Sequence, residues 1–302
     1  MTSADRHALD ELDSRIKIVL PPEYEESYEK VQPVSMGSAG LKFGADGAVA
    51  WNEMWGTFCD LAMAGGPPHK GMLLEPGTRA EIDAQPDRYR EIVDEIVRGV
   101  TMVTDLAVDE SRDPGWVRVF CHTETMAAWL LRAIVMENVA VRSEGRWLDL
   151  PAAPSFRLER EIKNVITVIA KTCHYWLGHM PPWQQRAIGN LFTRLEAEQP
   201  LVTPAPEGPA SDVTPIAERI QRDTGLRASP QRYHGWLGVE CTSVAVAIWM
   251  MRALVVMNVL ARREGTVLFV PVNQGSDPGG ERVSAWLARV CHLAALRGAS
   301  SS

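Results

Sequence analysis

Gly115-Trp-Val-Arg-Val-Phe-Cys121 begins the segment that decides the fold, because the same segment returns 120 residues later. Gly115–Pro151 aligns with Gly235–Pro271 at this constant offset without a gap, and 16 of the 37 positions are identical. Ordinary residue frequencies would give about two identities by chance. The sequence therefore predicts a tandem internal duplication of one helix-and-strand unit.

The pattern within this segment predicts a short strand, a long helix and a second short strand. Residues 115–121 suit a pleated surface, and Thr123 or Thr125 can cap the helix that follows, which we expect to reach Arg142. Residues 146–151 indicate the second strand. The equivalent apolar stretch, 243–261, approaches the length of a membrane span, but an arginine lies within it, so it indicates a helix buried in a soluble core.

The repeat extends beyond this segment. Cys59 is followed after seven residues by Pro67-Pro68, and Cys173 is followed in the same way by Pro181-Pro182, 114 positions later. A helix is predicted from Val49 to the Gly-Gly-Pro turn at residues 65–67, and another from Asp87 to Thr104, where apolar residues recur at helical spacing. A unit thus combines helices, a Pro-Pro turn and short strands.

The predicted fold is a helix-rich α+β protein whose two copies pack with pseudo-twofold symmetry and form one domain. Such a pair tends to create a crevice on its axis. The expected organisation is an irregular N-terminal arm (1–40, with a short helix at 10–20), copy 1 (41–155), copy 2 (156–275, with a Pro-rich loop at 200–215) and a C-terminal helix with a frayed tail (276–302).

Composition limits the class of protein and its partners. The chain has 302 residues, of which 46% are hydrophobic, so it can bury a core. Its net charge of -7 and scattered arginines argue against a nucleic-acid partner. The polar N-terminal residues and five cysteines without an export signal indicate a cytoplasmic protein with reduced thiols and no membrane partner.

Internal symmetry offers a way to separate structural residues from site residues. Residues shared by both copies are expected to serve packing, which both halves need. By this criterion Arg132 with Arg252, and Asn138 with Asn258, are structural pairs. The alternative is that Arg132 and Arg252 face a common crevice and clamp an anionic ligand from both sides.

Polar residues present in one copy alone are the better site candidates, and they accumulate in copy 1. His122 and Glu124 stand where copy 2 has Thr242 and Val244. The further candidates are Glu53, Trp55, Cys59, Asp60, His69 and Lys70.

Three chemistries fit this set. His69, His122, Asp60 and Glu53, with Glu124, offer nitrogen and oxygen ligands to a divalent metal. A histidine can instead act as general base for Cys59 or Cys121 as nucleophile. Finally, the glycine-rich turn with Lys70 can bind a carboxylate or phosphate. None of these matches an established motif, and the cysteine spacings do not indicate a structural zinc site.

The function expected from the sequence is a cytoplasmic enzyme that acts on a small polar or anionic metabolite. Its catalytic residues are expected to be His69, His122, Glu124 and Cys59, its ligand-binding residues Lys70, Arg132, Arg252 and Trp55, and a divalent metal is one of its candidate cofactors. The alternative is a binding module that uses the duplicated Arg and Trp positions without turnover, and a third is a scaffold or homodimer. Whether Cys291 and His292 complete the site stays open.

Overall fold

The computed structural model describes residues 1–21, 40–54, 71–111, 113–206 and 212–300. Within these ranges helices predominate, and the strands form two four-stranded antiparallel sheets. The predicted helix-rich α+β class is therefore confirmed.

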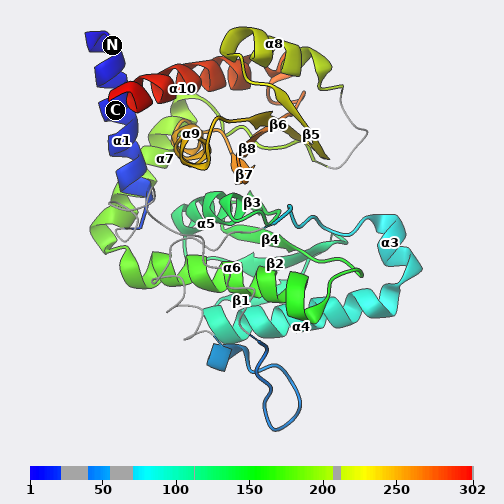
Figure 1. Ribbon diagram of the computed structural model, residues 1–302. Helices are drawn as coiled ribbons and strands as arrows, with labels where there is room; N and C mark the ends of the chain where they lie inside the picture. The colour runs from blue at the N-terminus through cyan, green and yellow to red at the C-terminus, as the bar shows by residue number, and fades with distance from the viewer. Residues whose placement is uncertain (22–39, 55–70, 112, 207–211, 301–302) are drawn as a thin grey trace. The chain divides into compact units, whose positions relative to one another are not determined.

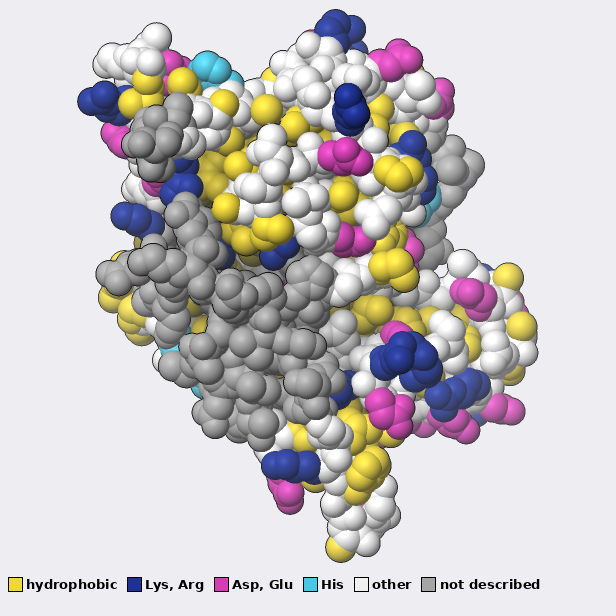
Figure 2. Space-filling model, viewed as in Figure 1, with side chains coloured by type: hydrophobic (Ala, Val, Ile, Leu, Met, Phe, Trp, Pro, Cys, Tyr) yellow, Lys and Arg dark blue, Asp and Glu magenta, His cyan; other side chains and the backbone are white. Residues whose placement is uncertain are grey.

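On the face drawn in Figure 2, the Lys and Arg side chains of the described residues are interspersed with Asp and Glu side chains. None of the helices in the described ranges is both long enough and apolar enough to traverse a bilayer.

The chain forms two compact units that do not follow the order of the sequence. Unit 1 consists of Met1–Leu20 together with Arg186–Ser302, and unit 2 consists of Pro21–Gln185. Unit 2 is therefore one continuous stretch that interrupts unit 1. The residues of predicted copy 1 lie within unit 2.

Unit 2 is a sheet covered by helices. The strand order is β1-β2-β4-β3, helices α4 and α5 pack against the sheet, and α6 packs against both of these helices (Figure 1). Its elements are α3 (Arg79–Ala84), α4 (Pro86–Thr104), β1 (Ala107–Glu110), β2 (Trp116–Phe120), α5 (Glu124–Met136), β3 (Arg142–Glu144), β4 (Trp147–Pro151), the π-helical turn η3 (Leu158–Ile162), α6 (Lys163–His174) and the π-helical turn η4 (Tyr175–His179).

Helix α4 shows how the local sequence sets these bounds. Pro86 occupies its first turn, where a missing N–H costs nothing. Ile92, Ile96 and Val100 are buried along one face, as their helical spacing predicts. The helix ends at Asp105, whose φ of 54° is left-handed. The predicted helix from Asp87 to Thr104 is confirmed.

Strand β2 gives the sheet of unit 2 two different faces. Val117 and Val119 are fully buried, whereas Trp116, Arg118 and Phe120 alternate with them and are partly exposed. This period of two places the valines on the helix-covered inner face and the other three side chains on the outer face.

Unit 1 has a sheet with order β5-β6-β8-β7, and α10 packs against α8 and α9 (Figure 1). Helix α1 packs against α9 and α10. Its elements are α1 (Ser3–Val19), α7 (Pro182–Glu198, which begins in unit 2), α8 (Thr214–Thr224), β5 (Ala228–Tyr233), β6 (Trp236–Glu240), α9 (Val244–Val255), β7 (Arg262–Glu264), β8 (Val267–Pro271), the short 3-10 turn η5 (Pro278–Gly280) and α10 (Glu281–Ser300).

Two elements differ in length from their predictions. The sequence predicts a short helix at 10–20 in an irregular arm, but α1 already begins at Ser3, because Thr2 and Asp5 form a reciprocal capping box. The helix predicted to reach Arg142 ends at Met136. Asn138 adopts a left-handed φ of 60° there and stops it, which frees Arg142 to begin β3.

The two sheets share further details. Trp116 pairs with Pro151 in unit 2, and Trp236 pairs with Pro271 in unit 1. Asn138 and Asn258 follow α5 and α9 with φ of 60° and 62°. The backbone carbonyls of these asparagines accept hydrogen bonds from Leu74 N and Val202 N, at 2.9 Å each. In each unit, the left-handed asparagine after the helix therefore binds a segment that lies earlier in the sequence.

Candidate functional site

The structure describes about half of the residues predicted for the site. Trp55, Cys59, Asp60, His69 and Lys70 lie outside the described residues. The described candidates are Glu53, His122, Glu124, Arg132 and Arg252. Glu53 is exposed on the first turn of the predicted helix at residues 51–54.

His122 and Glu124 lie where strand β2 passes into helix α5. Both side chains are exposed, and Thr123 between them caps α5 by accepting a hydrogen bond from Met126 N at 3.1 Å. The neighbouring Cys121 carbonyl accepts a hydrogen bond from Arg146 Nε at 3.0 Å. The structure thus places these two predicted residues at the end of the sheet, directly after the residue that Arg146 contacts.

Next to them, the outer face of the sheet carries arginines stacked on aromatic rings. The guanidinium carbon lies 4.1 Å from the ring centre in the Arg146–Phe120 pair, 4.7 Å in Arg142–Trp116 and 5.5 Å in Arg118–Trp147. Such stacking is attractive because the ring face is electron-rich. Trp147 is 39% exposed. We call this surface the Arg–aromatic face; it consists of Trp116, Arg118, Phe120, Arg142, Arg146, Trp147 and Asp149.

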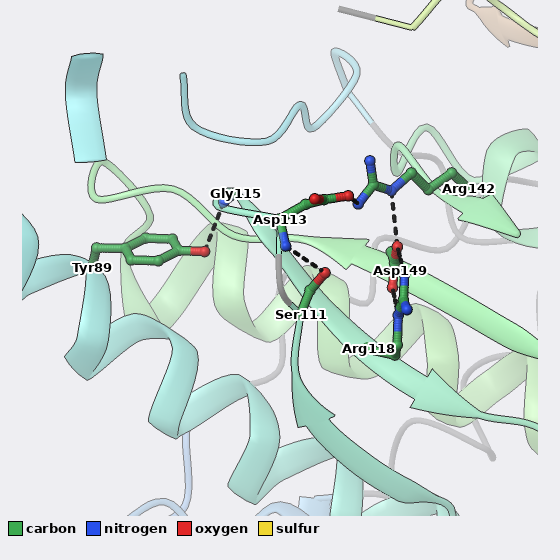
Figure 3. A network of polar contacts seen from close by, with 7 residues as sticks. All are labelled: Tyr89, Ser111, Asp113, Gly115, Arg118, Arg142 and Asp149. Carbon is green, nitrogen blue, oxygen red and sulfur yellow. Dashed lines mark hydrogen bonds and ion pairs between the residues drawn. The ribbon is translucent and has the colours of Figure 1, made fainter. Parts of the chain in front are cut away.

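Asp149 organises the centre of the Arg–aromatic face (Figure 3). Arg118 donates to both of its carboxylate oxygens, from Nε at 2.7 Å and from Nη2 at 2.8 Å. Arg142 Nε donates to Oδ2 at 2.8 Å. The Asp149 side chain is only 4% exposed, so its charge needs these partners. The hydrogen bonds to Asp149 in turn raise the pKa of Arg118.

A second acid joins this network from a loop. Asp113 accepts a hydrogen bond from Arg142 Nη2, and its side chain is 62% exposed. Its own backbone N–H donates to Ser111 Oγ at 3.2 Å. Gly115 N donates to the hydroxyl of Tyr89 on α4 at 2.7 Å, which ties the same loop to that helix (Figure 3). The outer partner of Arg142 is thus accessible to solvent, whereas the inner one is buried.

The corresponding positions in unit 1 differ in chemistry. Arg118 pairs with Asp149 across β2 and β4, and Gly238 pairs with Phe269 across β6 and β8. A Cβ atom on Gly238 would lie 2.9 Å from the Phe269 ring, so the glycine makes room for that ring. The ion pair of one sheet therefore stands where the other sheet has an aromatic ring over a glycine.

Sequence reasoning missed Arg118 and Asp149. The signal was present in the same alignment, since Arg118 aligns with Gly238 and Asp149 with Phe269 at the offset of 120. Cross-strand pairing, however, is a property of the register and not of the spacing along the chain.

The shared arginines lie inside helices. Arg132 and Arg252 are 4% and 7% exposed, on α5 of unit 2 and α9 of unit 1. Arg132 Nη1 donates to the carbonyl of Ala128, one turn earlier, at 2.8 Å. The two arginines belong to different units, so their joint action on one ligand stays a prediction.

The described thiols are poor nucleophiles. Burial raises the pKa of Cys121 and of Cys241 to about 12, and raises the pKa of Cys173 strongly. Since the thiolate is the reactive form, Cys121 has little nucleophilic character near neutral pH. Of the two cysteines predicted as nucleophiles, this leaves Cys59, which lies outside the described residues.

A buried ion pair joins helix α6 to the end of α5. Lys171 Nζ lies 2.7 Å from Glu137 Oε1, and the two side chains are 4% and 11% exposed. Removal from water lowers the pKa of Lys171, while Glu137 acts in the opposite direction. Glu137 belongs to copy 1 alone, because copy 2 has Met257 at the equivalent position.

Unit 1 contains a pocket of about 280 Å³ between helices α1, α7 and α10. Its walls combine both charges with an indole: Glu11 and Arg15 come from α1, and Trp286 and Arg289 from α10. The indole N–H of Trp286 donates to Gln199 Oε1 at 3.0 Å. A pocket of this composition can bind a small polar molecule.

Neither a cluster of metal-ligating side chains nor a similar known protein identifies the function of this chain. Among the residues that the structure describes, no group of three or more His, Cys, Asp or Glu side chains is arranged to hold a metal ion. No protein-family model, curated protein or solved structure matches this chain. The function of the Arg–aromatic face is therefore inferred from its hydrogen-bond donors, its aromatic rings and its charges.

Proposed function

We propose that the chain is an enzyme acting on a small anionic metabolite, and that the Arg–aromatic face of unit 2 binds the anionic group. The proposal rests mainly on one observation: Arg118 and Arg142 both donate hydrogen bonds to the buried carboxylate of Asp149. Asp149 fixes the planes of both guanidinium groups, which reduces the conformational entropy that a ligand would otherwise have to remove.

The two arginines keep donors for a ligand. A guanidinium has five N–H donors, and Arg118 and Arg142 each engage acids through Nε and Nη2. Within the described part of the chain, neither Nη1 donates a hydrogen bond. A carboxylate or phosphate can accept from these groups, and it can also displace the exposed Asp113 from Arg142.

The aromatic rings favour a particular class of anion. Trp116 and Trp147 lie beside the arginines, and Trp147 is well exposed. An anion that also carries a flat ring gains stacking energy that a simple ion does not. We therefore expect an aromatic phosphate or carboxylate to bind more tightly than inorganic phosphate.

His122 and Glu124 supply the chemistry in this proposal. They lie at the end of the face next to Arg146, and an imidazole can both accept and donate a proton near neutral pH. The metal-dependent form of the reaction would combine His122 with Glu53, Asp60 and His69. The reaction itself would take place in the cytoplasm.

The tandem duplication is part of the same inference. It is supported by the 16 identities in 37 positions and by the matching strand orders of the two sheets. In this view unit 2 gained Arg118 and Asp149 as a pair, while the equivalent pair in unit 1 remained apolar. Pseudo-twofold packing of the copies is the arrangement that we propose for the duplicated halves.

A pair exchange tests the binding site. The variant Arg118→Gly/Asp149→Phe carries the residues that unit 1 uses at these positions, so no charge is left buried without a partner. Titration calorimetry with adenosine monophosphate and with inorganic phosphate should show affinity weakened about tenfold or more, because charge-assisted hydrogen bonds are lost. The variant Arg79→Gln/Asp83→Asn, which removes an exposed ion pair on α3, is the matched control. Unchanged affinity in a folded pair-exchange variant would contradict the site.

The competing function is a binding module without turnover, as the pocket of unit 1 and the duplicated Arg and Trp positions suggest. Nuclear magnetic resonance spectra of a bound compound, recorded over hours with the protein present, distinguish the two. Conversion that is lost in His122→Gln while binding is kept supports the enzyme. Binding without conversion in the wild type supports the module.

A further inference from the structure

Two histidines face each other at the end of helix α6 in unit 2. His174 is the last residue of α6, and His179 is the last residue of the π-helical turn η4. In an α-helix, residues five apart point about 140° away from each other, given 3.6 residues per turn. The π-turn is wider, with hydrogen bonds that join residues five apart, and it therefore reduces this difference. Met180 N donates to the Tyr175 carbonyl at 3.0 Å and closes that turn.

The two imidazole rings converge through the same ring atom. His174 Nε2 and His179 Nε2 lie 2.8 Å apart, with ring centres 4.7 Å apart and planes inclined by 65°. One proton shared between the nitrogens accounts for this distance. Two histidine nitrogens bound to one metal at about 2.0–2.1 Å would stand roughly 3.0–3.4 Å apart. The two rings need to move apart by only a few tenths of an ångström, and the proton of the donating ring moves from its Nε2 to its Nδ1, so that both Nε2 atoms can bind the ion as neutral imidazoles.

The surroundings leave room for this exchange. Both histidines are partly exposed, so an ion can reach them from solvent. Gly178 lies beside the His174 ring: a Cβ atom there would stand 3.7 Å from Nδ1 and Cε1, and the glycine has none. On the other side the ring of Tyr175 meets His179 edge-on, with centres 5.4 Å apart, which supports its orientation.

We propose that His174 and His179 form a two-histidine binding site for a borderline divalent cation such as zinc, cobalt or nickel. Neutral imidazole nitrogen suits these ions, whereas magnesium and calcium require oxygen ligands. Water completes the coordination. The site shares no residue with the Arg–aromatic face or with His122, so its failure would leave the proposed function untouched.

Titration of the untagged, chelator-treated full chain with zinc chloride tests the site. The wild type should bind one equivalent through this pair, and His174→Gln and His179→Gln should each weaken that binding. Even a change outside the coordination shell weakens metal binding about tenfold or more, so loss of a ligand should cost at least as much. The control is His234→Gln, whose ring Nε2 lies 2.8 Å from the Pro206 carbonyl oxygen, and it should bind zinc as the wild type does. A double variant that binds zinc with wild-type affinity would overturn the proposal.

A measurement on the wild type removes the dependence on folded variants. Nitrogen-15 spectra of the histidine side chains should show two imidazoles whose Nε2 signals shift on addition of zinc, and no shift with magnesium. Zinc-induced shifts confined to other histidines, or the absence of any shift, would also overturn it.

Discussion

Burial governs the behaviour of Cys121 and leads to a pH dependence of stability. Its pKa rises from 9.0 in the unfolded chain to about 12 in the folded protein. The neutral thiol is therefore favoured by folding, and this contribution is complete below pH 9 and is lost as the pH rises toward 12. At pH 10.5 the loss should amount to about 2 kcal/mol, at 1.36 kcal/mol per pH unit.

Urea unfolding at pH 8 and pH 10.5 measures this loss. Other groups also titrate in this range, so the comparison is with Cys121→Ala, which should lose less stability between the two pH values by about the same 2 kcal/mol. An equal pH dependence in both proteins would show that Cys121 is more accessible than its burial indicates.

The ion pair of Lys171 and Glu137 gives a second prediction for single residues. Lys171→Met alone leaves the Glu137 carboxylate buried without its cation and should lower the free energy of unfolding by about 3–5 kcal/mol. Adding Glu137→Met, the residue found at position 257 in unit 1, should restore most of it, because two apolar groups replace two charges. Denaturant titration of both variants is the measurement, and a double variant as unstable as the single one would contradict the prediction.

At this scale the sequence predicted site residues unevenly. His122 and Glu124 were selected because they differ from their partners in copy 2, and the structure places both where β2 passes into α5; their role in a site stays a prediction. Asp149 was missed, since its importance comes from the arginines that reach it across the sheet. A comparison along the chain detects altered residues, whereas only the strand register shows which altered residues meet.

Among the elements, the turn after α5 depends on Asn138. Its φ of 60° is left-handed, and its side-chain Nδ2 donates to the Gly71 carbonyl at 3.0 Å. Asn138→Gly keeps the conformation and loses that hydrogen bond, at a cost of about 1 kcal/mol. Asn138→Ala also adds about 1–2 kcal/mol of backbone strain. Thermal unfolding of both variants should therefore rank alanine below glycine; equal stabilities would mean that the left-handed turn is not what holds the segment.

The same turn explains why the predicted helix was too long. Residues 137–142 continue an apolar pattern, so periodicity alone favours a helix to Arg142. A single asparagine with positive φ ends α5 at Met136 instead. By contrast α4 was predicted almost to the residue, because a proline opens it and an apolar stripe of several turns supports it. Long periodic elements are encoded locally, and their ends depend on one side chain.

For the whole molecule, the position of α1 leads to a prediction about cooperativity. Ile16 of α1 is 5% exposed, and Asp13 accepts a hydrogen bond from the indole N–H of Trp249 on α9 at 3.1 Å. Ile16→Ala should destabilise unit 1 by about 2–5 kcal/mol. The adjacent exposed residue supplies the control, Lys17→Ala, which should change little.

Hydrogen exchange resolved by peptide shows where this loss is felt. In Ile16→Ala, peptides from α9 and α10 should exchange faster, whereas β2 and β4 of unit 2 should keep their protection. Equal loss of protection in both units would show that they unfold as one. The sequence predicted neither the length of α1 nor its partner, since no local pattern records a contact between residues 236 positions apart.

The interruption of unit 1 by unit 2 also sets an order of assembly during synthesis. Residues 21–185 form a continuous unit and can fold as soon as they leave the ribosome. Helix α1 is made before unit 2, yet its partners α9 and α10 are made after it. Its apolar face, with Leu9, Leu12 and Ile16, therefore stays uncovered while most of the chain is translated. We expect α1 to be the segment of the nascent chain that a chaperone recognises.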